Sequence, residues 1–261
     1  MNVLKLILRY LNYFFKSKSK HSVHSPFVYE LVTKVINSKS VNNDLHEIEK
    51  LRADLCKNDN WIQITDLGAG SSINNVKKRK IKDIAKNSAK SKKYGKLLYR
   101  LANFLNVKNC IELGTSLGIS SSYLARANKD LVVYTLEGCP NTAKEAKKSH
   151  ESLNIDNVNI TVGDFNDNLI PTLKKIKTLD FAFIDGNHQE EPTIKYFEEC
   201  LKFCHEKSVF VFDDIHWSKG MENAWTYIKN HPKVFVTIDL FFVGLVFLNP
   251  KQEKEHFTIK F

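Results

Sequence analysis

Carboxylic acids recur at the ends of short apolar segments along this sequence. They are Glu112, Glu137, Asp164, Asp185 and the pair Asp213-Asp214. Each apolar segment has the character of a strand buried in a parallel sheet. The carboxyl ends of parallel strands meet at one edge of a sheet, where open α/β folds bind their ligands. A single acid at such a place often only caps a helix, but the whole series predicts a ligand site lined with carboxylates.

The segment 109–125 is expected to lie at the centre of this site. It has an apolar body around Ile111, followed by Gly114 and Gly118 and then by three serines that we expect to cap a helix. Glycine lets the backbone approach a ligand closely, as in nucleotide-binding turns between a strand and a helix. Glu112, directly before the turn, argues against a phosphate there. It suits a ligand that carries hydroxyl groups or a positive charge.

Glu137 lies 25 residues after Glu112. In a nucleoside-binding α/β unit a carboxylate at about this spacing binds both ribose hydroxyls. The alternative is that Glu137 caps the next helix, although Asn141 could do so instead. A dinucleotide fingerprint requires three glycines in the pattern G-x-G-x-x-G. Starting from Gly114, the other two places hold Ser116 and Ile119, so the sequence disfavours NAD.

Strands and helices are expected to alternate after the glycine turn. The expected strands are 131–137, 158–164, 179–185, 208–214, 234–239 and 242–248, and the expected helices are 142–153, 169–176, 192–204 and 221–230. This alternation predicts a Rossmann-like, doubly wound α/β fold with a mostly parallel sheet. The last two strands are almost contiguous, so they must form an antiparallel hairpin at the C-terminal end.

Residues 1–90 are expected to form a helical N-terminal extension or cap, before a main domain of residues 91–261. The first helix ends near Phe15, is amphipathic, and is too short to span a bilayer. It could lie on a membrane surface. We prefer packing on its own domain or on a partner subunit, as in a homodimer. The glycine turn at 66–72 is interpreted as a loop on the substrate side rather than a cofactor loop, because no apolar strand follows it.

The chain carries a formal net charge of +10, and ten lysines and arginines fall within residues 77–96. This basic segment is interpreted as a solvated face or loop. A nucleic-acid partner is possible but not favoured, because the interleaved aromatic residues of single-strand binding are missing. The five cysteines show no paired spacing, which indicates free thiols and a reducing, cytoplasmic location. Cys200 and Cys204 are expected on one helix.

Residues from about Tyr94 to Leu248 resemble the class I S-adenosylmethionine-dependent methyltransferases, most closely the catechol O-methyltransferase-like branch. The motifs that carry the resemblance are Glu112-Leu-Gly-Thr-Ser-Leu-Gly118, Glu137, Gly163-Asp164, Asp185-Gly-Asn-His188 and Asp213-Asp214, with Gly95-Lys-Leu-Leu98 in the helix before the turn. The resemblance implies a seven-stranded sheet, S-adenosylmethionine as cofactor and, in this branch, a divalent metal such as Mg²⁺ or Mn²⁺.

The resemblance also implies residue roles. Glu112, Gly114, Ser116 and Gly118 would line the methionine part of the cofactor, Glu137 the ribose, and Gly163 with Asp164 the adenine. Asp185, Asp213 and Asp214 match the metal ligands, and Asp185 would border the cofactor as well. The third of these ligands is typically asparagine in the family. His188 stands where the catechol enzymes have a lysine, and it is a candidate base for the acceptor hydroxyl.

The predicted function is an O-methyltransferase, assisted by a divalent metal, that acts on a hydroxyl group of a small aromatic or catechol-like acceptor. One alternative is the methylation of a hydroxylated tRNA base, which the basic segment suggests. The other is a non-catalytic cofactor-binding protein whose N-terminal helices bind a partner. Salt-dependent tRNA binding and turnover on an acceptor panel distinguish the three.

Overall fold

The computed structural model describes residues 3–19, 23–38, 45–65, 77–87 and 90–261. Its contacts divide the chain into two compact units, one formed by residues 1–39 and 177–261 and the other by residues 40–176. We call them the terminal unit and the central unit. This division does not test the expected boundary near residue 90, which stays a prediction.

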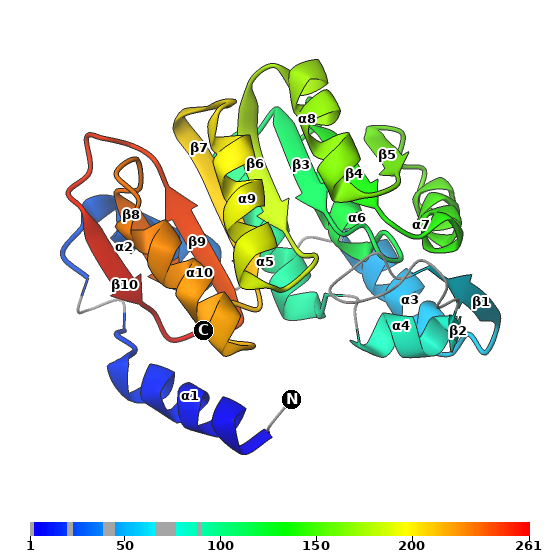
Figure 1. Ribbon diagram of the computed structural model, residues 1–261, viewed down its shortest axis with the longest axis horizontal. Coiled ribbons are helices and arrows are strands. Elements are labelled where there is room, and N and C mark those ends of the chain that lie inside the picture. Colours follow the sequence, from blue (N-terminus) through cyan, green and yellow to red (C-terminus); the bar gives the residue numbers. More distant parts are fainter. Residues whose placement is uncertain (1–2, 20–22, 39–44, 66–76, 88–89) are drawn as a thin grey trace. The chain divides into compact units, whose positions relative to one another are not determined.

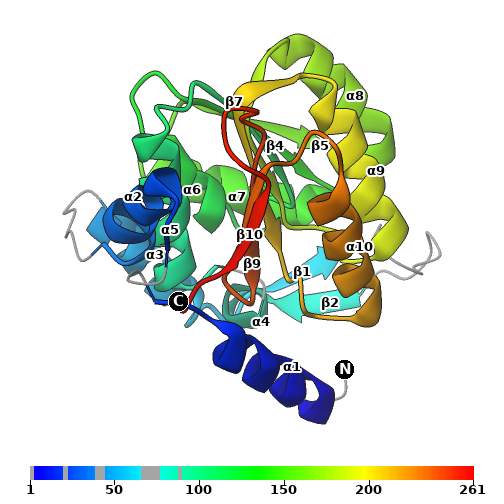
Figure 2. The ribbon, with the colours of Figure 1, turned by 90° about the vertical axis from the view of Figure 1, so that its left-hand side faces the viewer.

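The central unit holds three parallel strands in the order β3-β4-β5. Their bounds are β3 Asn109–Leu113, β4 Val132–Glu137 and β5 Val158–Val162. The helices of this unit are α3 His46–Leu55, α4 Ile81–Asn87, α5 Lys92–Phe104, α6 Ile119–Ala125, α7 Pro140–Ser152 and α8 Phe165–Ile176. Figure 2 shows α8 on one side of these strands and α5 with α6 on the other. Helices on both faces explain why β3 is almost completely buried.

The terminal unit continues the α/β pattern with strands in the order β10-β8-β9-β7-β6. Their bounds are β6 Leu179–Ile184, β7 Cys204–Asp213, β8 Val236–Asp239, β9 Val243–Phe247 and β10 Glu255–Thr258. β6 and β7 are parallel, whereas β9 is antiparallel to both β7 and β8. The reversed hairpin at the C-terminal end is therefore confirmed.

The helices of the terminal unit are α1 Val3–Lys16, α2 Pro26–Leu31 with a π-helical turn Val32–Ile36, α9 Glu190–Leu201 and α10 Lys219–Asn230. Helices α9 and α10 lie side by side along one face (Figure 1), and α2 lies on the other (Figure 2). The rings of Phe27 on α2 and Phe247 on β9 meet edge to face, with centroids 5.1 Å apart. The mostly parallel, Rossmann-like α/β fold with N-terminal helices is thus confirmed.

Several local expectations were wrong. The basic residues Lys77–Lys80 form an exposed strand, β2, paired antiparallel with β1 (Trp61–Ile64), and β10 was not anticipated. Helix α9 ends at Leu201, so Cys204 belongs to β7 and not to the same helix as Cys200. Helix α6 begins one residue after Gly118, so the three serines 120–122 lie inside it, buried, and do not cap it. All five cysteines are free.

Candidate functional site

The turn between β3 and α6 is fixed by main-chain hydrogen bonds, both within the turn and to β4. The amides of Gly114 and Thr115 both donate to the carbonyl of Leu136, at 2.9 and 3.2 Å, and Gly118 N donates to Thr115 O at 2.9 Å. Gly114, Ser116 and Gly118 have φ angles of 105°, 50° and 80°. A positive φ is costly for a residue with a side chain, and such strain gathers at binding and active sites. Ser116 is therefore a candidate for a functional position in the turn.

Glu137, at the end of β4, is oriented by backbone donors on both carboxylate oxygens. Ser116 N donates to Oε2 at 2.8 Å and Cys139 N donates to Oε1 at 2.9 Å. Burial raises the pKa of Glu137, and the two backbone hydrogen bonds oppose this rise. Each carboxylate oxygen has a second lone pair for a further donor. Glu137 is thus a preorganised acceptor for a pair of ligand hydroxyls, beside the turn.

Gly163 and Asp164, the predicted adenine contacts, follow β5, and Gly163 contacts Glu137 at the end of β4. Gly163 N donates to the main-chain carbonyl of Glu137 at 2.9 Å. Asp164 Oδ1 accepts from the amide of Asn166 at 2.7 Å, at the beginning of α8. The structure therefore brings Gly163 together with Glu137, and it gives Asp164 a local role in starting α8. A contact of Asp164 with adenine stays a prediction.

Glu112 lies beneath the turn and is completely buried. Thr135 donates to its Oε2 at 2.6 Å, and the Thr115 hydroxyl lies 2.6 Å from the Thr135 hydroxyl. Burial raises the pKa of Glu112 to about 7, and hydrogen bonds from Ser120 and Thr135 oppose the rise only in part. A carboxyl at this depth supports the turn through Thr135. A direct contact between Glu112 and the cofactor stays a prediction.

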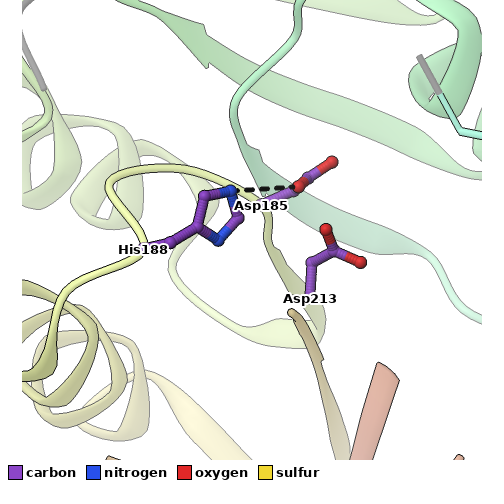
Figure 3. A group of neighbouring side chains, drawn as sticks. All are labelled: Asp185, His188 and Asp213. Carbon is purple, nitrogen blue, oxygen red and sulfur yellow. Dashed lines mark ion pairs between the residues drawn. The ribbon is translucent and has the colours of Figure 1, made fainter. Parts of the chain in front are cut away.

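Asp185, His188 and Asp213 form a separate group in the terminal unit. Asp185 directly follows β6, Asp213 ends β7, and His188 lies in the loop after Asp185. One ligand atom from each of the three side chains lies within 4.8 Å of the others. Figure 3 shows the imidazole of His188 directed at Asp185, with Nε2 3.8 Å from Oδ1, and the Asp213 carboxylate beside them. Two carboxylates and an imidazole are a donor set that divalent cations accept.

Asp214 and the nearby His216, whose imidazole could also bind a metal or a substrate, lie outside this group among the residues that the structure describes. Asp214, the third predicted metal ligand, follows β7 with a φ of 56° and is not part of the group. His216 Nε2 lies 2.7 Å from Asp239 Oδ2, and its ring stacks on Phe241 with centroids 5.3 Å apart. His216 therefore has a structural contact, and His188 occupies the place beside Asp185 and Asp213.

The structure also shows what the sequence did not reveal. The buried hydroxyls of Thr115 and Thr135 link Glu112 to the turn, and neither was singled out. The contact between Thr135 and Glu112 follows from the register of β3 on β4, which places the two residues opposite each other. This register is set by the pairing of the two strands in the folded protein. The second glycine turn, residues 66–72, lies outside the described residues.

The donor sets fit the groups that the resemblance implies. The turn offers backbone at positive φ, and tight packing requires glycine at position 118, where an added Cβ would lie 2.8 Å from His150 Nε2. Glu137 offers acceptors for ribose hydroxyls. The acids Asp185 and Asp213, close together with His188, offer ligands for a divalent ion.

Known proteins are similar to this chain in sequence. Residues 111–215 match the profile of a family described as a methyltransferase domain. A catechol O-methyltransferase of Mycobacterium tuberculosis is 32% identical over 129 residues, which cover 49% of this chain and 57% of that protein. The chain thus aligns with a little over half the length of this curated relative.

Solved structures agree in fold. The O-methyltransferase TomG of Streptomyces achromogenes, determined with S-adenosylmethionine, gives a TM-score of 0.57 at 20% identity and covers 85% of this chain and 95% of its own. An O-methyltransferase of Bacillus cereus, in complex with S-adenosylhomocysteine, gives a TM-score of 0.55 at 20% identity and covers 84% of this chain and 96% of its own. Residues 111–215 thus match a methyltransferase domain, about half of the chain is similar to catechol O-methyltransferases, and the solved structures share its fold.

Proposed function

We propose that this protein transfers a methyl group from S-adenosylmethionine to a hydroxyl of a small aromatic acceptor, with the help of a divalent cation. The observation that carries the proposal is the group formed by Asp185, His188 and Asp213. A methyltransferase that acted on carbon or on a basic nitrogen would have no need of this arrangement. The similarity to catechol O-methyltransferase supports the same reaction class.

The cofactor would be held by the central unit. Glu137 would accept hydrogen bonds from the ribose hydroxyls, since two backbone amides already orient its carboxylate. Gly114, Ser116 and Gly118 would border the methionine part, and Gly163 with Asp164 the adenine. Glu112 would support the turn from beneath. When bound, S-adenosylmethionine supplies a methyl group on a sulfonium for in-line displacement, so the protein has chiefly to align the reacting atoms.

The acceptor would be prepared by the terminal unit. Asp185 and Asp213 would hold the divalent ion, which lowers the pKa of a bound hydroxyl and fixes its position. His188 would take the hydroxyl proton as the oxygen–methyl bond forms and the sulfur–methyl bond breaks. Asp214 would contribute negative charge after β7 rather than a direct ligand. Trp217, 40% exposed, would offer an apolar wall to an aromatic acceptor.

The decisive experiment combines calorimetry and turnover. We expect S-adenosylhomocysteine to bind with or without Mg²⁺ or Mn²⁺, and methyl transfer to a catechol panel to require the metal. Full activity in excess EDTA would contradict metal assistance. Cofactor binding without turnover on any acceptor would favour the non-catalytic alternative.

His188→Gln separates two roles of the histidine. If His188 is the base, metal affinity stays within about twofold while the rate falls by roughly a hundredfold or more. The rate should then also lose the rise with pH that a titrating imidazole gives. If metal affinity collapses instead, His188 is a ligand and not the base.

The exposed basic strand β2 supports a second candidate, methylation of a hydroxylated tRNA base. Lys77, Lys78 and Arg79 are all exposed. Such a function requires tRNA binding that weakens steeply with salt. Weak binding that is flat with salt would eliminate this candidate and leave the small-molecule function untouched.

A further inference from the structure

Helix α1 contacts the rest of the terminal unit through one side, which carries Arg9 and Tyr13. The Tyr13 hydroxyl donates to the carbonyl of Ile259 at 2.5 Å and accepts from Phe261 N at 3.2 Å. One turn earlier, the Arg9 guanidinium donates to the carbonyls of His216 and Trp217 and pairs with a glutamate of α10. Tyr13 is 4% exposed. These polar contacts hold α1 in one orientation beside the C-terminal end of the chain (Figure 1).

The remainder of α1 presents a wide apolar surface. Its exposed fractions are 64% for Leu4, 50% for Ile7, 57% for Leu8, 43% for Leu11, 41% for Phe14 and 81% for Phe15. At 3.6 residues per turn these six side chains form one continuous face, which we call the outer face of α1. Six large apolar side chains gathered on one exposed helix face mark an interaction site rather than scattered surface residues.

Three lysines lie next to the outer face. Lys5 and Lys16 fall on the same side of the helix, next to the apolar arc, and both are exposed. The Lys260 ammonium lies 4.6 Å from the centre of the Phe14 ring. The first acidic residue of the chain is Glu30, so α1 itself contains none. An apolar face whose charged neighbours are all cations complements an anionic lipid surface, where lysine stems lie along the interface and their ammonium groups reach the headgroups.

We propose that α1 is an interfacial helix that docks this protein on an anionic lipid surface through its outer face. No helix in the described parts of the chain is long and apolar enough to cross a membrane, so the contact would be peripheral. A second copy of the chain is less well suited to the same face. In an antiparallel pair of α1 helices, Lys5 of each copy would lie near Lys16 of the other, and the like charges would repel.

The test uses the full-length protein and sedimentation with lipid vesicles. We expect binding to vesicles of equimolar phosphatidylglycerol and phosphatidylcholine, and at least about tenfold weaker binding to phosphatidylcholine alone. Lys5→Gln with Lys16→Gln should weaken binding to the anionic vesicles by roughly 30-fold, because each of the two lysines contributes a similar factor to the affinity for an anionic surface. Leu8→Ser with Phe15→Ser should reduce it by more than about tenfold.

A matched control is Tyr29→Ser with Trp61→Ser, which removes two exposed apolar side chains that do not belong to α1, 46% and 59% exposed. It should bind vesicles like the wild type, and thermal melts should show that all variants remain folded. Equal binding of the outer-face variant, or equal binding to neutral and anionic vesicles, would overturn the proposal. So would a wild-type dimer in light scattering that Leu8→Ser with Phe15→Ser dissociates, together with no vesicle binding. Methyl transfer to a water-soluble acceptor is a separate readout, so failure here leaves the proposed function unaffected.

Discussion

The glycine turn of the central unit and the acid–histidine group of the terminal unit are built in different ways. The turn is held by main-chain hydrogen bonds, and its carboxylate, Glu137, accepts two backbone amides. The other group consists of side chains, with two like-charged carboxylates close together and His188 Nε2 3.8 Å from Asp185. Backbone donors preorganise the first region before any ligand arrives. In the second region a cation would offset the repulsion of Asp185 and Asp213.

The largest effect is expected from a substitution in the acid–histidine group of the terminal unit. Asp185→Asn should lower metal-dependent methyl transfer on the order of a thousandfold, because a metal contributes several kcal/mol to the barrier reduction. Affinity for S-adenosylhomocysteine in calorimetry should change by less than about twofold, because the substitution leaves the glycine turn and Glu137 intact. Asp180→Asn, in the strand that Asp185 follows and paired with His205, is the control that should keep its activity. Loss of cofactor binding in Asp185→Asn would show that the two regions are not independent.

The next effect concerns the support beneath the turn. Because the Glu112 pKa is raised from 4.5 to about 7, the folded state holds its proton more tightly than the unfolded state does. This contribution to stability is complete below pH 4.5 and is lost as the pH rises to 7, by about 3 kcal/mol in all.

Glu112→Gln removes the titration, so its stability relative to wild type should increase between these pH values. Urea unfolding at pH 4.5, 6 and 8 measures the difference. Parallel pH curves for the two proteins would mean that Glu112 titrates normally, and the account of a buried acid under the turn would be wrong.

A smaller effect is expected from the ribose carboxylate. Glu137→Gln should weaken S-adenosylhomocysteine binding by roughly 10- to 100-fold, the value of one or two charge-assisted hydrogen bonds. Metal affinity should be unchanged. Glu151→Gln, at the end of α7 and well exposed, is the matched control and should bind normally. Unchanged affinity in Glu137→Gln would eliminate the ribose assignment.

The smallest effect compares two glycines. Gly118→Ala should destabilise the protein by about 1–3 kcal/mol, because the residue has φ +80° and a Cβ there would lie 2.8 Å from His150 Nε2. Gly220→Ala in α10 meets only ordinary contacts, the nearest at 3.4 Å, and should be neutral or slightly stabilising. Thermal unfolding measures both. Equal effects would show that the turn is not the rigid element described above.

Much of the fold followed from the sequence because its signals are local. Apolar segments ending in acids marked β3, β4, β6 and β7, and the closely spaced strands at 236–247 required a hairpin. The strand β2 was missed because four consecutive basic residues lack the apolar pattern of a strand. It forms by pairing with β1, and such pairing is a tertiary effect that propensity does not report.

By itself, the sequence determined the types of groups that meet at the strand ends, because β-α alternation brings the ends of neighbouring parallel strands to one edge. It placed Glu137 beside the turn, and Asp185 and Asp213 after neighbouring strands. Only the tertiary structure decided which side chains meet. It joined His188 rather than Asp214 to the two aspartates, and it placed Glu112 beneath the turn against Thr135. The physical reason is that a side chain's direction depends on loop torsions and strand register, such as the φ of 56° at Asp214, and these arise only when the strands pack.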